Sequence, residues 1–295
     1  MYYRRKVVLS ILQVFENELE KIQVQKLLFL LSRYKTKKKT YDFVPYKLGS
    51  FSFQANADLN TLKKYGIVEE TNTTWKKIND ENYLTQLEKE HQKIISDFKI
   101  IYKNKSSDDL IKLTYKNFPY YAINSIVADK YLSATELKKI DKKRPTDTET
   151  VLFTIGYEGI SLESYLNKLI RNNVALLCDV RKNAASMKYG FSKRQLENAC
   201  NGVGIKYRHI PEVGIDSDKR QKLETQEDYD ALFKNYVAEN LTKTVSTQLE
   251  IFNLLKESKR IALTCFEADK CQCHRLHLAK AIENLEDFSF EVDHL

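Results

Sequence analysis

The chain has 295 residues, with 48 Lys and Arg against 40 Asp and Glu, which gives a net charge of +8 and an isoelectric point of about 9.0. A hydrophobic content of 42% with 11% aromatic residues can build packed cores, which excludes a disordered or low-complexity chain. The length is typical of two domains, because single cores seldom grow beyond roughly 250–300 residues. No apolar run reaches the roughly 20 residues that a membrane-spanning helix needs, so we expect no membrane partner.

Charge and cysteine content both change near residues 138–150. Residues 1–150 contain 28 Lys and Arg against 19 Asp and Glu, whereas residues 151–295 contain 20 and 21. All five cysteines lie in the second part, without an even framework, which indicates reduced thiols and a cytoplasmic protein. The polar segment 138–150, which contains Pro145, therefore predicts a linker between a basic domain, residues 1–137, and a second domain, residues 151–295.

Apolar residues recur at helical spacing through the basic half. They predict three helices, over residues 3–20, 22–34 and 57–65. Two short apolar strands around Asn72 then predict a hairpin. Further helices are expected near residues 81–103, 107–116 and 120–130. Three helices followed by a hairpin is the element order of a winged helix, a fold that often binds DNA.

The basic half also resembles the Panacea domain of bacterial antitoxins and related winged-helix proteins. The resemblance covers about residues 5–80 and rests on the segments KLLFLLSRY, YDFVPYKLGSFS and DLNTLKKYGIVEE. It implies that this half binds a macromolecule, DNA or a protein, and does no chemistry. Members of that family usually carry a Gly-Pro step where this chain has Gly49-Ser50.

Lysines of the basic half are candidates for contacts with nucleic acid. A basic winged helix neutralises phosphates, and each contact adds salt-dependent affinity. The alternatives are that these lysines only solvate the surface, or that Tyr and Phe side chains of this half form a patch for a protein partner. We expect DNA as the partner. The candidates are Lys35, Lys37, Lys38, Lys39, Lys63, Lys64, Lys76 and Lys77.

Strands and helices alternate in the second half, which predicts an α/β domain with a mostly parallel sheet. The expected strands are VLFTIGYEG, VALLCDVRKN, IKYRHIPEVG and RIALTCFEA, with SFEVDHL at an edge. The helices between and after them are SLESYLNKLIRNN, KRQLENACNG, YDALFKNYVAENL, TVSTQLEIFNLLKESK and CHRLHLAKAIENL. Ligands of such sheets bind beyond the carboxyl ends of the strands. Carboxylates, arginines, a thiol and a histidine are expected to meet at that edge.

These residues also carry a resemblance to the domain of unknown function 488 family, over about residues 152–295. The motifs occur in order as TIGYEG, CDVRKNAASMKYGFSKRQLENACNGVGIKYRHIPEVG, ALTCFEADKCQCHR and VDHL. The resemblance implies an α/β domain whose polar positions suggest an enzyme, but it implies no particular reaction. The positions that match the motifs are Gly156, Asp179, Arg181, Lys193, Leu196, Gly204, Tyr207, Pro211, Gly214, Cys265, Glu267, Cys273, His274 and Arg275.

The cysteines and histidines near the end of the last buried strand allow several interpretations. Segment 271–274 together with His277 could bind zinc, but the spacing is not that of paired CxxC motifs, so we predict no metal and no other cofactor. Cys265 or Cys273, near Arg275 and a helix N-terminus, would be a nucleophilic thiolate. The alternative is that these thiols are buried residues that pack like small apolar side chains.

Arginines and carboxylates at the same edge suit an anionic substrate. Arg181 and Arg275 can grip a phosphate or carboxylate, while Asp179 and Glu267 serve as acid and base, or else pair with the arginines structurally. The catalytic candidates are Asp179, Glu267, Cys265 and Cys273. The candidates for substrate binding are Gly156, Tyr157, Glu158, Arg181, Lys193, His274 and Arg275.

Together these patterns predict an enzyme domain that a DNA-binding winged helix brings to nucleic acid. The expected chemistry is hydrolytic, on a nucleotide, a base or a nucleic-acid-linked group, with a small phosphate-bearing ligand, as would suit bacterial phage defence. One alternative is a non-catalytic, antitoxin-like DNA-binding regulator whose α/β domain senses a ligand or a redox state. Another is a sulfur-transfer enzyme with a persulfide on Cys265 or Cys273.

Overall fold

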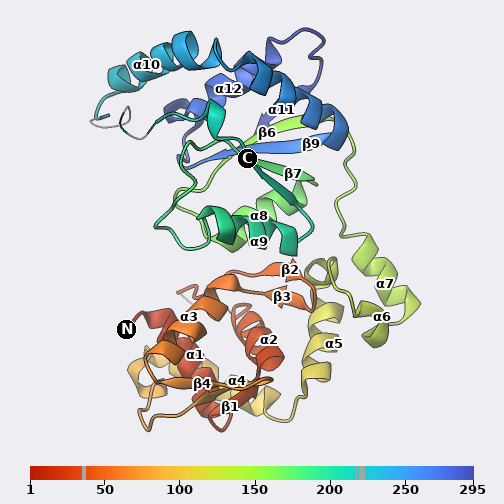
Figure 1. Ribbon diagram of the computed structural model, residues 1–295. Coiled ribbons are helices and arrows are strands. Elements are labelled where there is room, and N and C mark those ends of the chain that lie inside the picture. Colours follow the sequence, from red (N-terminus) through yellow and green to blue (C-terminus); the bar gives the residue numbers. More distant parts are fainter. Residues whose placement is uncertain (35–37, 217, 219–222) are drawn as a thin grey trace. The chain divides into compact units, whose positions relative to one another are not determined.

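The computed structural model describes residues 1–34, 38–216, 218 and 223–295, and the chain divides into two compact units, residues 1–144 and 145–295 (Figure 1). The segment expected to be a linker, residues 138–150, begins inside helix α7 (Ala134–Asp141). Ser133 caps that helix through a capping box with Glu136, and buried Ile140 anchors its last turn. No helix among the described residues is both long and apolar enough to span a membrane.

Unit 1 is mainly helical, with a small antiparallel sheet. Its elements are α1 (Tyr3–Val14), β1 (Glu18–Glu20), α2 (Lys21–Leu31), β2 (Val44–Tyr46), β3 (Gly49–Phe51), α3 (Phe53–Lys64), β4 (Val68–Glu70), β5 (Thr74–Lys77), η1 (Leu84–Gln86), α4 (Lys89–Tyr102), α5 (Ser107–Asn117), η2 (Pro119–Ala122), α6 (Ala128–Tyr131) and α7. Strands β4 and β5 form the expected hairpin, and β1 joins it in the order β1-β5-β4. Strands β2 and β3 pair as a separate hairpin.

Two of the helices expected in unit 1 are shorter than their periodicity indicates. The first ends at Val14, because Glu16 and Asn17 take positive φ angles of 66° and 65°, which break the helix and start β1. The helix expected over residues 81–103 begins only at Lys89. The segment 120–130 is not one helix: it holds the short turn η2 and the beginning of α6.

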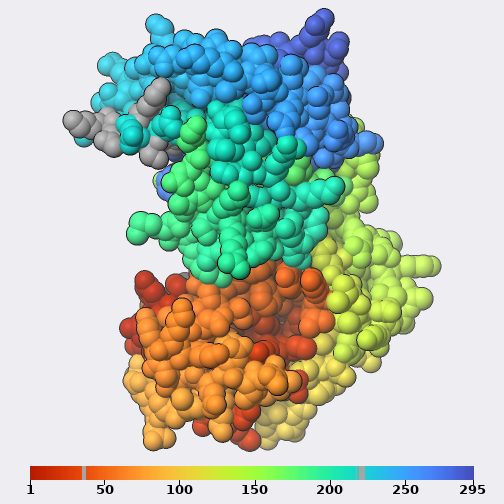
Figure 2. Space-filling view, in the orientation of Figure 1, coloured from red at the N-terminus to blue at the C-terminus, as the bar shows by residue number. Residues whose placement is uncertain are grey.

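Unit 2 is a five-stranded parallel sheet covered by helices on both faces, which confirms the predicted α/β fold with a parallel sheet. Its elements are β6 (Val151–Gly156), α8 (Leu162–Arg171), β7 (Leu176–Asp179), α9 (Lys193–Gly202), β8 (Lys206–His209), η3 (Pro211–Val213), α10 (Gln226–Asn235), the π-helical turn η5 (Tyr236–Leu241), α11 (Val245–Ser258), β9 (Arg260–Cys265), η6 (Lys270–Gln272), α12 (His274–Glu283) and β10 (Glu291–His294). Helices α8 and α9 cover one face of the sheet, and α11 and α12 cover the other (Figure 1). Helices α10 and α11 form much of the surface of this unit in Figure 2.

The strand order β10-β6-β9-β7-β8 positions the site. Strand β9, the fourth in the unit's sequence, lies between β6 and β7, and every residue of β6, β7 and β9 is buried. The register pairs Gly156 with Cys265 and Asp179 with Thr264. The carboxyl ends of three neighbouring strands therefore meet at one edge, where parallel sheets bind ligands.

A buried lysine is an unusual feature of the core of unit 1. Lys26 of α2 is 2% exposed, and its Nζ donates to the carbonyl oxygens of Leu48 and Ser50. Burial lowers the pKa of Lys26 to about 7. A neutral amine keeps two N–H groups, enough for both carbonyls.

We predict that the stability of unit 1 rises with pH above about pH 7. In that range the buried Lys26 gives up its proton, while the same lysine in the unfolded chain keeps it up to its ordinary pKa near 10.4, so the unfolded state binds more protons. The slope should approach about 1.4 kcal/mol per pH unit. Urea unfolding at pH 7 and pH 9, followed by the fluorescence of Trp75, the single tryptophan and a residue of β5, measures it.

The matched variant for this experiment is Lys26→Met, which should be less stable overall, because two carbonyl groups lose their donor, but should lack this pH dependence. The same pH dependence in the variant and the wild type would show that Lys26 is not its source.

Candidate functional site

A pocket of about 330 Å³ opens at the edge where β6, β9 and β7 end. Its walls come from the ends of two of these strands and from the long loop after β7. The lining residues are Tyr157, Arg181, Lys182, Asn183, Ala185, Ser186, Met187, Ile215, Cys265, Phe266 and Glu267. Four of the predicted site residues thus share one pocket, namely Tyr157, Arg181, Cys265 and Glu267.

Gly156 and Glu158 shape this pocket without lining it. A Cβ atom on Gly156 would lie 1.8 Å from the carbonyl oxygen of Glu267, so only glycine allows the chain after β9 to pass so close to β6. The carboxylate of Glu158 accepts a hydrogen bond of 3.0 Å from the backbone N–H of Ala268. Both residues were expected to bind substrate, but the structure places them where they hold the loop 266–268.

Asp179 and Arg181 form a buried ion pair. Arg181 Nε donates to Asp179 Oδ1 at 2.8 Å, and its Nη1 donates to Tyr157 Oη at 2.7 Å and to the carbonyl of Phe191 at 2.9 Å. Tyr207 Oη donates to the other carboxylate oxygen at 2.6 Å. Burial opposes the charge of Arg181, but the hydrogen bonds and negative charge of Asp179 raise its pKa above the ordinary value.

This network changes the roles predicted for its members. Asp179 is fully buried and its oxygens accept from Arg181 and Tyr207, so it is not placed as an acid or base that meets a substrate. Arg181 reaches the pocket wall with part of its guanidinium already engaged. Its charge at the wall is therefore balanced by that of Asp179.

Arg275 supports the pocket from behind and does not line it. The side chain is 2% exposed, and its terminal nitrogens donate to the carbonyls of Glu267 and Ala268. Among the residues that the structure describes, Arg275 Nε has no hydrogen-bond partner. Arg275 was expected to bind a substrate, but in this structure its side chain binds the backbone that carries Glu267.

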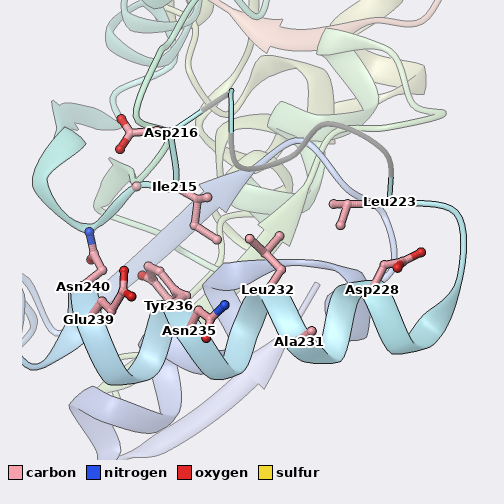
Figure 3. Close-up of a pocket in the computed structure, with 11 residues that line it drawn as sticks. Ile215, Asp216, Leu223, Asp228, Ala231, Leu232, Asn235, Tyr236, Glu239 and Asn240 are labelled. Atoms are coloured by element: carbon pink, nitrogen blue, oxygen red, sulfur yellow. The ribbon is translucent and has the colours of Figure 1, made fainter.

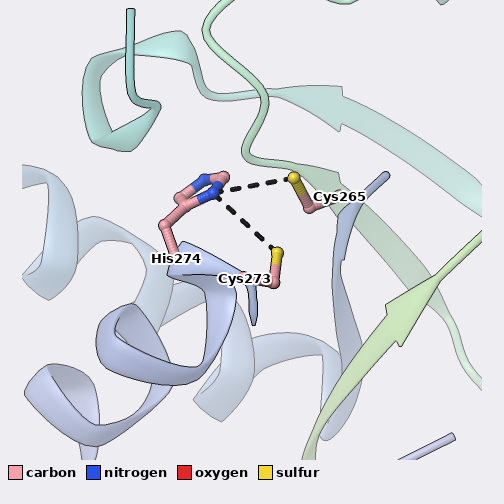
Figure 4. A group of neighbouring side chains, drawn as sticks. All are labelled: Cys265, Cys273 and His274. Atoms are coloured by element: carbon pink, nitrogen blue, oxygen red, sulfur yellow. Dashed lines mark hydrogen bonds between the residues drawn. The ribbon is translucent and has the colours of Figure 1, made fainter. Parts of the chain in front are cut away.

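Two thiols and one imidazole meet beneath the pocket (Figure 4). His274 Nδ1 lies 3.6 Å from Cys265 Sγ and 3.9 Å from Cys273 Sγ. His274 Nε2 lies 3.0 Å from the carbonyl oxygen of Val180, which can only accept, so Nε2 carries the proton. In the neutral ring Nδ1 then presents a lone pair to both thiols.

The members of this cluster differ in access to the pocket. Cys265 lines it, and its Sγ lies 3.1 Å from Glu267 Oε2, so the predicted pair Cys265 and Glu267 does come together. His274 and Cys273 are fully buried and do not line the pocket, so His274, expected to bind substrate, lies behind the pocket wall. Burial, and then the neighbouring Cys265 thiol, raise the pKa of Cys273 well above its ordinary value, which does not suit a nucleophile.

Lys193 was expected at the site, whereas Lys188 was missed. Lys193 is exposed at the start of α9 and does not line the pocket. Lys188 Nζ donates to the carbonyl of Tyr157 at 2.6 Å, and burial lowers its pKa. The Tyr157 ring stacks on Phe191, with centroids 4.2 Å apart. The loop MKYGFS, with its basic and aromatic residues, was the feature of the sequence that could have indicated Lys188 and Phe191.

The lysines expected to bind nucleic acid in unit 1 differ in their surroundings. Lys35 and Lys37 lie outside the described residues. Three others form ion pairs, namely Lys38 with Glu88, Lys39 with Asp42 and Lys63 with Glu70. Lys64 and Lys76 are exposed. Lys77, also expected to bind nucleic acid, is 6% exposed and donates to the carbonyl of Asn79, so its amine is already engaged.

A larger hollow in unit 2, of about 490 Å³, lies along α10 (Figure 3). Two of the polar groups that line it already serve the fold. Asp228 completes the capping box of α10 with Thr225, and Tyr236 donates to the carbonyl of Val213 at 2.6 Å. We therefore place the candidate site at the strand ends, where a thiol and a carboxylate line one pocket.

We predict that Asp179→Asn destabilises unit 2 by about 3–5 kcal/mol, because it leaves the buried guanidinium of Arg181 without a counter-charge. Chemical unfolding followed by far-ultraviolet circular dichroism measures the change. Asp230→Asn, on the exposed face of α10, is the matched control and should change stability by less than about 0.5 kcal/mol. Equal effects of the two variants would contradict a structural role for the ion pair.

Comparisons with known proteins bear on unit 2. A search of curated proteins gave no match for this chain. A family model described as "Domain of unknown function DUF488" matches residues 161–282. The matched segment runs from the N-cap of α8 into α12 and contains the ion pair, the pocket loop and the thiol–imidazole cluster. The match at residues 161–282 supports the resemblance to this family that the sequence motifs of the second half carry.

Proposed function

We propose that the protein is a nucleic-acid-associated enzyme that carries out hydrolysis in the pocket of unit 2, with Glu267 as its general acid and base. The observation that carries the proposal is that Glu267 and Cys265 line one pocket at the carboxyl edge of a parallel sheet. The carboxylate is half-buried, and its backbone is held by Arg275 and by the close approach at Gly156. Such fixed placement is what acid–base catalysis requires.

The pocket favours a small anionic substrate. Its volume of about 330 Å³ lies in the range of small-molecule sites, and the positive charge in its wall comes from Lys182, next to Arg181 whose charge Asp179 balances. The ring of Phe266, which is 42% exposed, lines the same space and offers a surface for a planar group. A nucleotide, a base or a nucleic-acid-linked group combines these features.

Unit 1 supports the association with nucleic acid. Apart from the hairpin β2–β3 that lies between α2 and α3, the elements α1, β1, α2, α3, β4 and β5 follow the order expected of a winged helix, and β1 pairs with β5 of the hairpin. Exposed Lys64 at the end of α3 and Lys76 in the hairpin are suited to phosphate contacts. A DNA-binding unit joined to a hydrolytic one would act on foreign or modified DNA, as in bacterial phage defence.

We predict that Glu267→Gln lowers hydrolysis at least about 100-fold, because the amide cannot transfer protons. The full chain is incubated with nucleosides, nucleotides and DNA duplexes that contain ordinary or modified bases, and products are measured by mass spectrometry. Glu257→Gln, on the exposed surface of α11, should keep the wild-type rate. If none of these substrates is converted to product, or if both variants convert it at equal rates, the proposed hydrolysis is contradicted and a non-catalytic regulator is favoured.

DNA binding by unit 1 is tested separately. We expect the affinity of the full chain for a DNA duplex to fall steeply with salt, and the double variant Lys64→Gln, Lys76→Gln to reduce the slope of log affinity against log salt by about 1.8, or 0.9 for each lost phosphate contact. Lys103→Gln with Lys105→Gln, two exposed lysines after α4, is the matched control. No binding at low salt, or equal slopes in the two double variants, would refute these contacts.

A further inference from the structure

We infer that Cys265, Cys273 and His274 form a binding site for one zinc ion beneath the pocket of unit 2. Their ligand atoms lie within 4.8 Å of one another, although Cys265 ends β9 while the other two residues begin α12 (Figure 4). All three side chains are buried, and the two elements that carry them belong to the core of the unit. The cluster is therefore held in place before any ion arrives.

The separations fit tetrahedral coordination. With a Zn–S bond of about 2.3 Å and a Zn–N bond of about 2.0 Å, a sulfur and a nitrogen ligand at the tetrahedral angle stand about 3.5 Å apart. The observed distances from His274 Nδ1 are 3.6 Å to Cys265 Sγ and 3.9 Å to Cys273 Sγ. Each sulfur is thus within a few tenths of an ångström of the separation from Nδ1 that a shared ion requires, and the three ligand atoms all lie within 4.8 Å of one another.

The surroundings of His274 have the form found around metal-binding imidazoles. Such a ring usually donates its other N–H to a carboxylate or a backbone carbonyl, which fixes the tautomer and directs the free nitrogen at the ion. Here Nε2 donates to the carbonyl of Val180, in the segment after β7, at 3.0 Å. Nδ1 is thereby left as the ligand atom on the side of the thiols.

The donor set also selects the kind of metal. Two thiolates and an imidazole suit zinc, whereas magnesium and calcium prefer oxygen ligands. The ligands differ from those considered on sequence spacing, where Cys271 and His277 were included. Cys271 is exposed, and the ring of His277 packs against Phe233 with centroids 4.6 Å apart.

The pocket gives the ion both access and a fourth ligand. Cys265 lines the pocket, and Glu267 Oε2 lies 3.1 Å from its sulfur, so the fourth position is filled from that side by water or by the Glu267 carboxylate. Zinc lowers the pKa of a bound water to about 7. Zinc binding does not rest on the proposed hydrolysis, but it would supply the activated water that hydrolysis needs.

The test is metal binding by the full chain, reduced with a non-chelating phosphine and stripped of metal. We expect one equivalent of Zn²⁺ per chain, no binding of Mg²⁺, and with Co²⁺ the charge-transfer absorption of thiolate ligands. Cys265→Ser and Cys273→Ser should each weaken Zn²⁺ binding more than about 100-fold. Mutations of residues that only support the ligands weaken metal binding by up to about 100-fold, so the loss of a ligand should exceed that. Cys271→Ser, two residues away and exposed, should bind like the wild type.

Several results would overturn the inference: no Zn²⁺ bound by the reduced wild type, a cobalt spectrum without thiolate absorption, or binding that depends on Cys271 instead of Cys265 and Cys273. The cobalt spectrum uses the wild type alone, so it decides the matter even where a serine variant fails to fold. Zinc binding without turnover of any substrate would refute the proposed function only. Turnover by a chain that binds no zinc would refute this inference only.

Discussion

The site of unit 2 depends on the close approach of two backbones where β6 ends and the chain leaves β9. A side chain as small as a methyl group on Gly156 would collide with the carbonyl oxygen of Glu267. The backbone N–H groups of Tyr157 and Glu158 both donate to the carbonyl of Phe266, which fastens the two segments together. Cys265 and Glu267 flank this junction, so their placement follows from a steric constraint and a pair of backbone hydrogen bonds.

Charged groups around this junction divide into those that build the wall and those that face the pocket. Asp179, Arg181 and Arg275 are buried, and a buried charge is tolerated only with a partner or with several hydrogen bonds. Asp179 and Arg181 are each other's charged partner, and Arg275 donates hydrogen bonds to carbonyl groups of the loop. Glu267, in contrast, is half-buried and lines the pocket.

The positive charge of unit 1 is less available than the composition indicates. Several lysines of the basic half pair with nearby carboxylates, and exposed ion pairs of this kind add little stability but do neutralise surface charge. Lys26 goes further and lies inside the core, where burial favours its neutral form. The basic surface of unit 1 is therefore smaller than its lysine content indicates. It includes exposed side chains such as Lys64 and Lys76.

The sequence by itself determined the kinds of elements in unit 2 and the residues at their ends. Apolar runs, a Ser161 cap and regular alternation are local properties, and the side chain of Ser161 does accept from the N–H of Ser164 at the start of α8. Only the tertiary structure decided which ends are neighbours. It placed β9 between β6 and β7, brought His274 next to both thiols and paired the terminal nitrogens of Arg275 with backbone carbonyls. These outcomes depend on contacts between residues far apart in the chain, which no local pattern encodes.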